Sequence, residues 1–250
     1  LVWCRNDLRL ADNPALERAV ARGGPVIPVF IWGPEEEAPW APGGASRYWL
    51  HQSLKRHSEA FAGKGSRLVI RRGAALPALR SLIAETGAGA VYWNRRYEPA
   101  VIARDKAVKA ALREDGVETA SFNASLLFEP WTIQNKSGGP FQVFTPFWKH
   151  CLAQAPPSAP LPPPSAIPAP KAFPMSETVE ALGLEPAIDW AGGIRDAWEF
   201  GEAGAETTLG RFLENALEDY GSDRDLPAKA GTSRLSPYFH FGEIGPRQVW

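Results

Sequence analysis

Val26-Ile27-Pro28-Val29-Phe30-Ile31-Trp32 is the stretch of sequence that decides the fold. Its apolar residues follow one another almost without interruption, whereas a half-buried strand alternates apolar with polar residues. A near-continuous apolar run is typical of a strand that is covered on both faces, as in a parallel sheet between two layers of helices. Gly23-Gly24, just before the run, favours the end of a preceding helix. The sequence therefore predicts an internal strand of an α/β domain.

The same pattern recurs on both sides of this strand. Further strands are expected at Leu1–Trp3, Leu68–Ile70, Ala90–Trp93 and Val117–Phe122. Helices are expected between them, at residues 14–21, 46–62, 76–85 and 99–114. These connections are too long for hairpins and imply right-handed crossovers between parallel strands. We predict a doubly wound, five-stranded parallel sheet of Rossmann-like type.

Beyond the sheet, the composition changes twice. Residues 155–174 contain nine prolines, which predict a stiff connector. Phe141–Lys149, just before it, is expected to be extended and to end in a turn. After the connector the pattern is helical, with a helix expected from Trp198 to Tyr220, Gly221 as its C-cap, and another helix starting at Gly245-Pro246. We predict an α/β domain at 1–130, an interdomain linker at 131–175, and the beginning of an all-α domain at 176–250.

Composition limits the class of protein. Of the 250 residues, 44% are hydrophobic and 22% are charged, which is typical of a soluble globular chain. No apolar run approaches the roughly 18 residues that span a bilayer. Two cysteines form no disulfide framework, and four histidines show no ligand spacing, so we expect a cytoplasmic protein without a metal site. The net charge of −1 conceals an acidic segment at 176–250, with 14 acidic and 6 basic residues, which is a poor bulk surface for nucleic acid.

Aromatic and ionic residues follow several predicted strands. Arg5, Trp32, Asn94 and Glu98 emerge at the carboxyl ends of strands, where parallel sheets bind ligands. This combination suits a flat, charged small molecule. The alternative is a solvated rim of charged residues over core tryptophans. No GxGxxG or P-loop pattern supports an ordinary dinucleotide or NTP site.

A second candidate site is the loop at Gly231–Gly242. Thr232, Ser233 and Ser236 place three hydroxyl groups beside Arg234, and Ser236-Pro237 is typical of a helix start with a hydroxyl at the N-cap. Such a loop can bind a phosphate or pyrophosphate, although an ordinary capped helix is the alternative. Glu243, directly after it, is expected to be a surface charge.

Four segments together resemble the DNA photolyase/cryptochrome family. They are Val2–Leu16, Ala45–Leu50, Phe141–Lys149 and Thr232–Tyr238, in the family's order along most of the chain. The resemblance implies FAD as cofactor, contacted by Tyr220 and by Thr232, Ser233, Arg234, Leu235 and Ser236. It also implies an antenna chromophore in the sheet domain, methenyltetrahydrofolate or a deazaflavin, with Arg5, Trp32, Asn94 and Glu98 as its candidate contacts. Val101 stands near a place where some folate-binding relatives have an acidic residue, so the antenna stays open between the two.

The activity implied by the resemblance is light-driven repair of cyclobutane pyrimidine dimers by electron transfer from reduced FAD, that is, a deoxyribodipyrimidine photo-lyase. Its partner would be damaged DNA, approached by Arg224 at the backbone, and we expect a monomer without membrane contact. The catalytic residues are expected beyond Trp250. One alternative is a cryptochrome, a blue-light receptor without repair activity. The other is a light-independent α/β protein that binds a small ligand.

Overall fold

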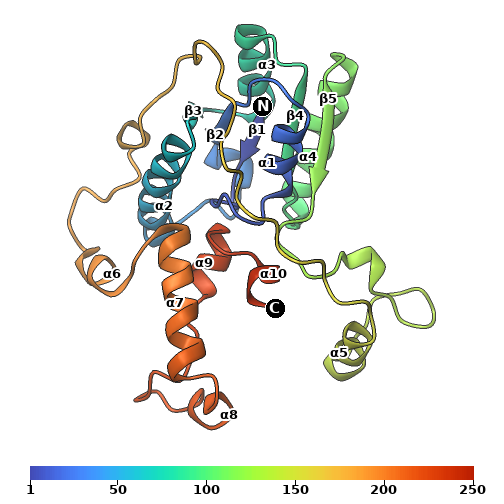
Figure 1. Cartoon of the computed structure of the whole chain (residues 1–250), viewed down its shortest axis with the longest axis vertical. Coiled ribbons are helices and arrows are strands. Elements are labelled where there is room, and N and C mark those ends of the chain that lie inside the picture. The colour runs from blue at the N-terminus through green and yellow to red at the C-terminus, as the bar shows by residue number, and fades with distance from the viewer.

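The computed structural model describes residues 1–250 and contains one parallel sheet with the strand order β3-β2-β1-β4-β5 (Figure 1). The strands are β1 (Val2–Cys4), β2 (Pro28–Trp32), β3 (Val69–Arg72), β4 (Ala90–Asn94) and β5 (Glu118–Phe122). The central strand is β1, where Trp3 lies opposite Val29 of β2 and opposite Trp93 of β4. The predicted doubly wound sheet is therefore confirmed.

Two pairs of helices cover the two faces of the sheet. They are α1 (Pro14–Ala21) and α2 (Gly44–Gly63) on one face, and α3 (Ala75–Thr86) and α4 (Pro99–Glu114) on the other. Successive residues of β1 alternate between the faces: Val2 and Cys4 belong to the core under α1 and α2, whereas Trp3 belongs to the core under α3 and α4. A 3₁₀ turn at Pro34–Glu37 follows β2.

The predicted linker at 131–175 contains a helix. A 3₁₀ turn at Pro130–Thr132 precedes α5 (Phe144–Leu152), which lies on an arm away from the sheet (Figure 1). The prediction of an extended Phe141–Lys149 is wrong. The proline-rich stretch that follows forms no helix or strand and returns along the sheet domain, where Ile167 is buried and its backbone N–H donates to the Lys64 carbonyl at 2.9 Å.

The last segment is helical and contains no strand. Its elements are a 3₁₀ turn at Glu180–Leu182, α6 (Gly192–Ala197), α7 (Gly201–Asn215), α8 (Tyr220–Asp223), α9 (Ser236–Phe241) and α10 (Pro246–Val249). The helix expected over 198–220 is shorter, because α7 ends at Asn215. Gly221 lies inside α8, so its prediction as a C-cap is wrong. The start of a helix at Pro246 is confirmed.

Helix α9 shares its core with the sheet domain. Leu235, Tyr238 and Phe241 are buried in the same hydrophobic cluster as residues of β1 and α2. The predicted domain boundary at 175–176 therefore separates segments that are in close contact, and it stays a prediction. None of the helices is both long enough and apolar enough to span a lipid bilayer.

Candidate functional site

A cavity of about 360 Å³, which we call the rim cavity, lies beyond the carboxyl ends of β1 and β2. Ligands bind at this edge of parallel sheets, because the loops after the strands converge there. The cavity wall comes from the ends of β1 and β2 with the segments after them, from α2, from the start of α3, from α4 with the residues before it, and from α9. Its polar and aromatic residues include Trp3, Arg5, Asn6, Trp32, Glu37, Trp40, Arg96, Glu98, Arg104, His240 and Phe241.

One wall of the rim cavity is a buried ion-pair cluster. Asp105 accepts from Nη1 of Arg5 at 2.5 Å and from Arg104 at 2.9 Å. Both guanidinium groups also lie against the indole of Trp3, at 4.5 Å and 5.1 Å from its ring. Burial lowers the pKa of Arg5, and the nearby Asp105 carboxylate opposes that shift. This wall is therefore preformed, and Asp105 offsets one of its two positive charges.

A second charged wall is centred on Arg96. Its guanidinium pairs with Glu37 at 2.5 Å and with Glu98 at 2.8 Å. Burial alone would lower the pKa of Arg96, but the hydrogen bond to Glu98 and the charge of Glu37 outweigh burial and raise it. Because the arginines of the cavity are paired with carboxylates, the site suits a ring with both donors and acceptors better than a free phosphate.

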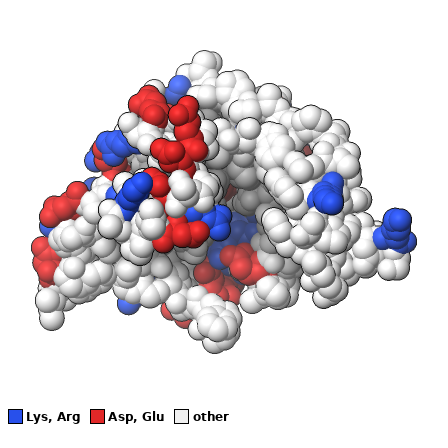
Figure 2. All heavy atoms as spheres, turned by 90° about the horizontal axis from the view of Figure 1, so that it is seen from below, with Lys and Arg blue, Asp and Glu red and all other residues white.

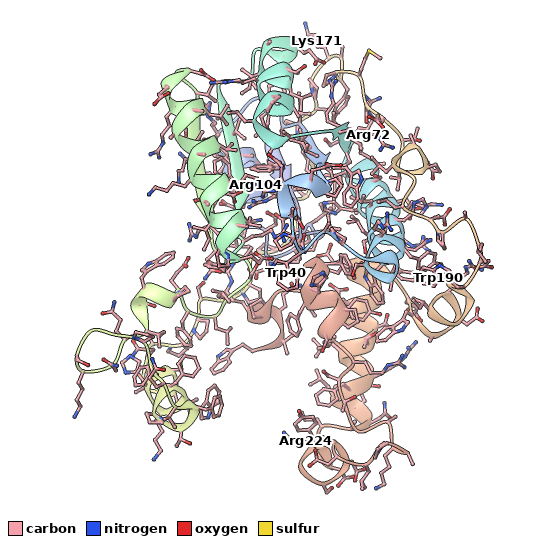
Figure 3. The ribbon with its side chains drawn as sticks, turned by 180° about the vertical axis from the view of Figure 1, so that it is seen from behind. Trp40, Arg72, Arg104, Lys171, Trp190 and Arg224 are labelled. Carbon is pink, nitrogen blue, oxygen red and sulfur yellow. The ribbon has the colours of Figure 1, made fainter.

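The cavity also offers aromatic surface and unused donors. Trp40 is 84% exposed at its edge, and Figure 3 shows it close to the end of the sheet domain that faces the last helices. Nε1 of Trp3 and Nε of Arg5 are buried without a hydrogen-bond partner. Unsatisfied buried donors are costly, so a ligand acceptor that reached either nitrogen would gain binding energy. The residues present thus fit a flat heteroaromatic molecule.

The structure brings three of the four predicted antenna contacts together. Arg5, Trp32 and Glu98 all line the rim cavity. Asn94 does not line the cavity, and its side chain makes hydrogen bonds within the protein instead. Its buried amide donates to Asp7 at 2.6 Å and to Asn13 at 2.7 Å, so it holds the loop after β1 in place. Asn94 was predicted as a ligand contact because it ends a strand, and its side chain turns back into the loop instead.

A second hollow, of about 470 Å³, contains part of the predicted phosphate loop. We call it the loop cleft; it is lined by residues that include Arg195, Trp198, Arg211, Asn215, Thr232, Ser233, Arg234 and Tyr238. Two of its three arginines form ion pairs, Arg195 with Asp189 and Arg211 with Glu199. Arg234 pairs with no carboxylate; its guanidinium stacks on Trp198, 4.2 Å from the ring. It is therefore the cation of this cleft that can accept a new anion.

The start of α9 differs from the prediction. Leu235, which is buried, occupies the N-cap position, and Ser236 is the first helical residue, so no side chain caps the helix. Pro237 lies in the first turn as expected. The predicted hydroxyl N-cap at Ser236 is wrong. The candidate phosphate site is consequently the loop cleft with Thr232, Ser233 and Arg234, and the end of this six-residue helix is not part of it.

Tyr220 and Arg224 lie outside both cavities, at the first residue and at the C-cap of α8. Tyr220 is 38% exposed and packs edge-on against Phe212, 5.8 Å away, which itself lines the loop cleft. Arg224 lies over the Tyr220 ring at 5.6 Å and 3.5 Å from Asp225. Figure 3 places Arg224 at the far tip of the molecule, well away from Trp40 and Arg104. The structure therefore separates these two predicted residues from the rim cavity.

The N-terminal segment and the end of α9 contact each other directly, which no local sequence pattern indicates. The Asn6 amide donates to the His240 carbonyl at 2.9 Å, and Nη1 of Arg9 donates to the Gly242 carbonyl at 2.9 Å. Gly242 has φ +66°, and a Cβ on it would overlap the backbone of Asn6. Only glycine allows this close approach without strain. The N-terminal segment is thus packed directly against the end of α9.

Glu243 has a structural role that its sequence context does not indicate. It is fully buried, so its prediction as a surface charge is wrong. Its carboxylate accepts from Trp49 at 2.9 Å, from Ser53 at 2.7 Å and from the backbone N–H of Gly201 at 2.6 Å. Burial raises the pKa of Glu243, while these three donors oppose the shift. Glu243 therefore joins α2, α7 and the end of α9.

This arrangement defines an α/β domain with a ring-sized cavity, joined to helices that carry a cleft with one unpaired arginine. A family model described as DNA photolyase matches residues 1–168. The deoxyribodipyrimidine photo-lyase of Agrobacterium fabrum is 48% identical over 251 residues, which cover 100% of this chain and 52% of that protein. Cryptochrome-2 of Arabidopsis thaliana is 41% identical and is covered over 42% of its length.

A solved structure agrees with these sequence relatives. The crystal structure of a bacterial class III photolyase from Agrobacterium tumefaciens has a TM-score of 0.95 and 48% identity, and the match covers 100% of this chain and 51% of that one. The chain belongs to the DNA photolyase family. It spans about half the length of the curated relatives named here.

Proposed function

We propose that the protein repairs cyclobutane pyrimidine dimers in DNA by light, as a deoxyribodipyrimidine photo-lyase. The observation that carries this proposal is the likeness to the Agrobacterium photolyases, at 48% identity and a TM-score of 0.95 over the whole chain. A light-independent ligand-binding protein with the same sheet would need neither the loop at 232–236 nor the packing of the end of α9 against the N-terminal segment. Reduced FAD, excited by blue light, would supply the electron that opens the dimer.

The phosphates of FAD are assigned to the loop cleft. Thr232 and Ser233 offer hydroxyl groups there, and Arg234 offers a guanidinium that no carboxylate neutralises. A charge-assisted hydrogen bond from such a group is about twice as strong as a neutral one. Tyr220 packs against Phe212, which lines the loop cleft. The flavin would therefore extend from the cleft toward α8.

The rim cavity is assigned to the antenna chromophore, either methenyltetrahydrofolate or a deazaflavin. Both are flat heteroaromatic molecules with donors and acceptors at their edges. The cavity supplies matching surfaces: the rings of Trp32 and Trp40, the carboxylates of Glu37 and Glu98, and the partly unsatisfied guanidinium of Arg5.

Damaged DNA is the proposed substrate, with Arg224 at its backbone. Arg224 is exposed at the tip of the helical segment, where a phosphate could reach it. Acidic and basic side chains are intermixed on the face that Figure 2 shows, and no continuous basic surface covers it. Arg224 would therefore contribute locally. Two free, buried cysteines fit a reducing cytoplasm, and we propose a monomer there.

The test is a repair assay on the whole protein with reduced flavin. An oligonucleotide with one thymine dimer is illuminated with blue light while the absorbance of intact thymine is followed. Light-dependent recovery of that absorbance is the expected result, with a dark sample as control. The 41% identity to Cryptochrome-2 favours one alternative, a blue-light receptor. Bound flavin that photoreduces normally while no dimer is repaired would reject repair of this lesion and favour the receptor.

A further inference from the structure

Helix α9 contributes to both candidate sites. The three residues Thr232, Ser233 and Arg234, just before it, line the loop cleft. Its last two residues, His240 and Phe241, line the rim cavity. A helix of six residues is not stable by itself, because too few hydrogen bonds offset the cost of nucleation. The position of α9 therefore depends on what holds its two ends.

The carboxyl end of α9 is held by the wall of the rim cavity. Within the loop after β1, Asn6 donates its amide to the His240 carbonyl at 2.9 Å, and the Leu8 N–H donates to the Phe241 carbonyl at 3.2 Å. Asn6 and its neighbour Arg5 line the same cavity as His240 and Phe241. A molecule in the rim cavity would thus contact both sides of this junction.

An aromatic cluster connects the two hollows a second time. Trp49 of α2 stacks on Phe241, with ring centres 5.9 Å apart, and meets Tyr238 and Trp198 edge-on at 5.4 Å and 5.2 Å. Phe241 lines the rim cavity, whereas Tyr238 and Trp198 line the loop cleft. One side chain therefore touches residues of both sites.

We propose that the rim cavity and the loop cleft bind their ligands cooperatively, through α9. The inference rests on the proposed function, which assigns an antenna chromophore to the cavity and the FAD phosphates to the cleft. A chromophore in the cavity restricts Asn6, His240 and Phe241, and with them the helix that follows the phosphate loop. FAD then binds a loop whose position is held more firmly and loses less conformational entropy. Linkage requires that FAD strengthens chromophore binding by the same factor.

The experiment measures this factor on the whole protein, stripped of both chromophores. FAD is titrated with and without saturating methenyltetrahydrofolate, and in parallel with a deazaflavin; then the chromophore is titrated with and without saturating FAD. We expect each Kd to fall by about five- to fifty-fold, within the usual range of coupling between sites. Both ligands binding with unchanged Kd values would overturn the linkage and leave the proposed function intact. Failure to bind FAD, or to bind either chromophore, would overturn both.

Two variants test the route through α9. Asn6→Asp keeps the size of the side chain but removes the donor to the His240 carbonyl. Its matched control is Asn135→Asp, which removes a similar amide donor to the Pro140 carbonyl in an exposed turn. Trp49→Phe trims the aromatic contact between the cavities and also removes one of the three donors to Glu243. We expect Asn6→Asp or Trp49→Phe to lower the coupling factor at least threefold, while Asn135→Asp retains it. Wild-type coupling in both test variants would refute the role of α9.

Discussion

Gly242→Ala should separate α9 from the N-terminal segment. Gly242 has φ +66°, where alanine costs about 1 kcal/mol more than glycine, and the added Cβ would overlap backbone atoms of Asn6 and Asp7. Relieving that overlap moves the end of α9 away and costs about 1–3 kcal/mol, as overpacking does elsewhere. It also weakens the hydrogen bonds of Leu8 and Arg9 to the end of α9. With about 1 kcal/mol added for these weakened hydrogen bonds, we expect the free energy of unfolding to fall by about 3–5 kcal/mol in total.

The matched control is Gly87→Ala. Gly87 follows α3 with the same φ of +66°, but nothing lies within 4 Å of the position that its Cβ would take. It therefore carries the conformational cost alone, about 1 kcal/mol. Urea denaturation followed by near-ultraviolet circular dichroism measures both variants. If they differ by less than about 0.5 kcal/mol, the close approach at Gly242 is not a source of stability.

Three other residues give further expectations. Burial lowers the pKa of His57 to about 3. Between about pH 6 and pH 4 the unfolded chain therefore binds a proton that the native chain does not bind. The free energy of unfolding falls by about 1.4 kcal/mol per pH unit as the pH drops through this range. His57→Leu should remove this slope in urea titrations, and an unchanged slope would contradict the burial. Arg234→Ala should weaken FAD binding about tenfold or more, because it removes a charged donor. The control is Arg211→Ala, which should weaken FAD binding less because Arg211 is already paired with Glu199. Equal losses in the two variants would contradict the assignment of the phosphates to Arg234. Arg224→Ala in the whole protein should weaken binding to damaged and undamaged DNA alike. It should also reduce the slope of the logarithm of the binding constant against the logarithm of salt concentration by about one. A loss of affinity confined to damaged DNA would show that Arg224 has another role.

The sheet could be predicted because its strands carry a strong local signal. The apolar run that contains β2 and the similar runs at β3 and β4 need no tertiary information to be read as strands. Helix α5 was missed for a local reason as well. Phe144, Phe147, Trp148 and Leu152 have helical spacing, but Pro146 favours a break; here it falls in the first turn, where proline costs no hydrogen bond.

The residues of the rim cavity were predicted only where they lie at or shortly after the end of a strand, and those of the loop cleft only where the loop itself carries hydroxyl groups and a charge. Arg5 and Trp32 were found in this way, whereas His240 and Phe241 enter the rim cavity from a helix more than 200 residues later. No local pattern shows which distant element will complete a cavity. Glu243 was misjudged for the same reason, because its three donors come from α2 and the start of α7.

The packing of the loop after β1 against the end of α9 has a consequence for biosynthesis. Buried Asp12 pairs with Arg247 at 2.6 Å, and Arg9 donates to the Gly242 carbonyl, so these early charges depend on residues made more than 230 positions later. At about 5–20 residues per second, the ribosome needs roughly 10–50 s to supply them. During that time the central strand β1 is available to its sheet neighbours, while Trp49 of α2 still lacks the aromatic cover that Tyr238 and Phe241 provide. Because transiently exposed apolar surface promotes aggregation and chaperone capture, the nascent chain is exposed to both in the interval before α9 leaves the exit tunnel.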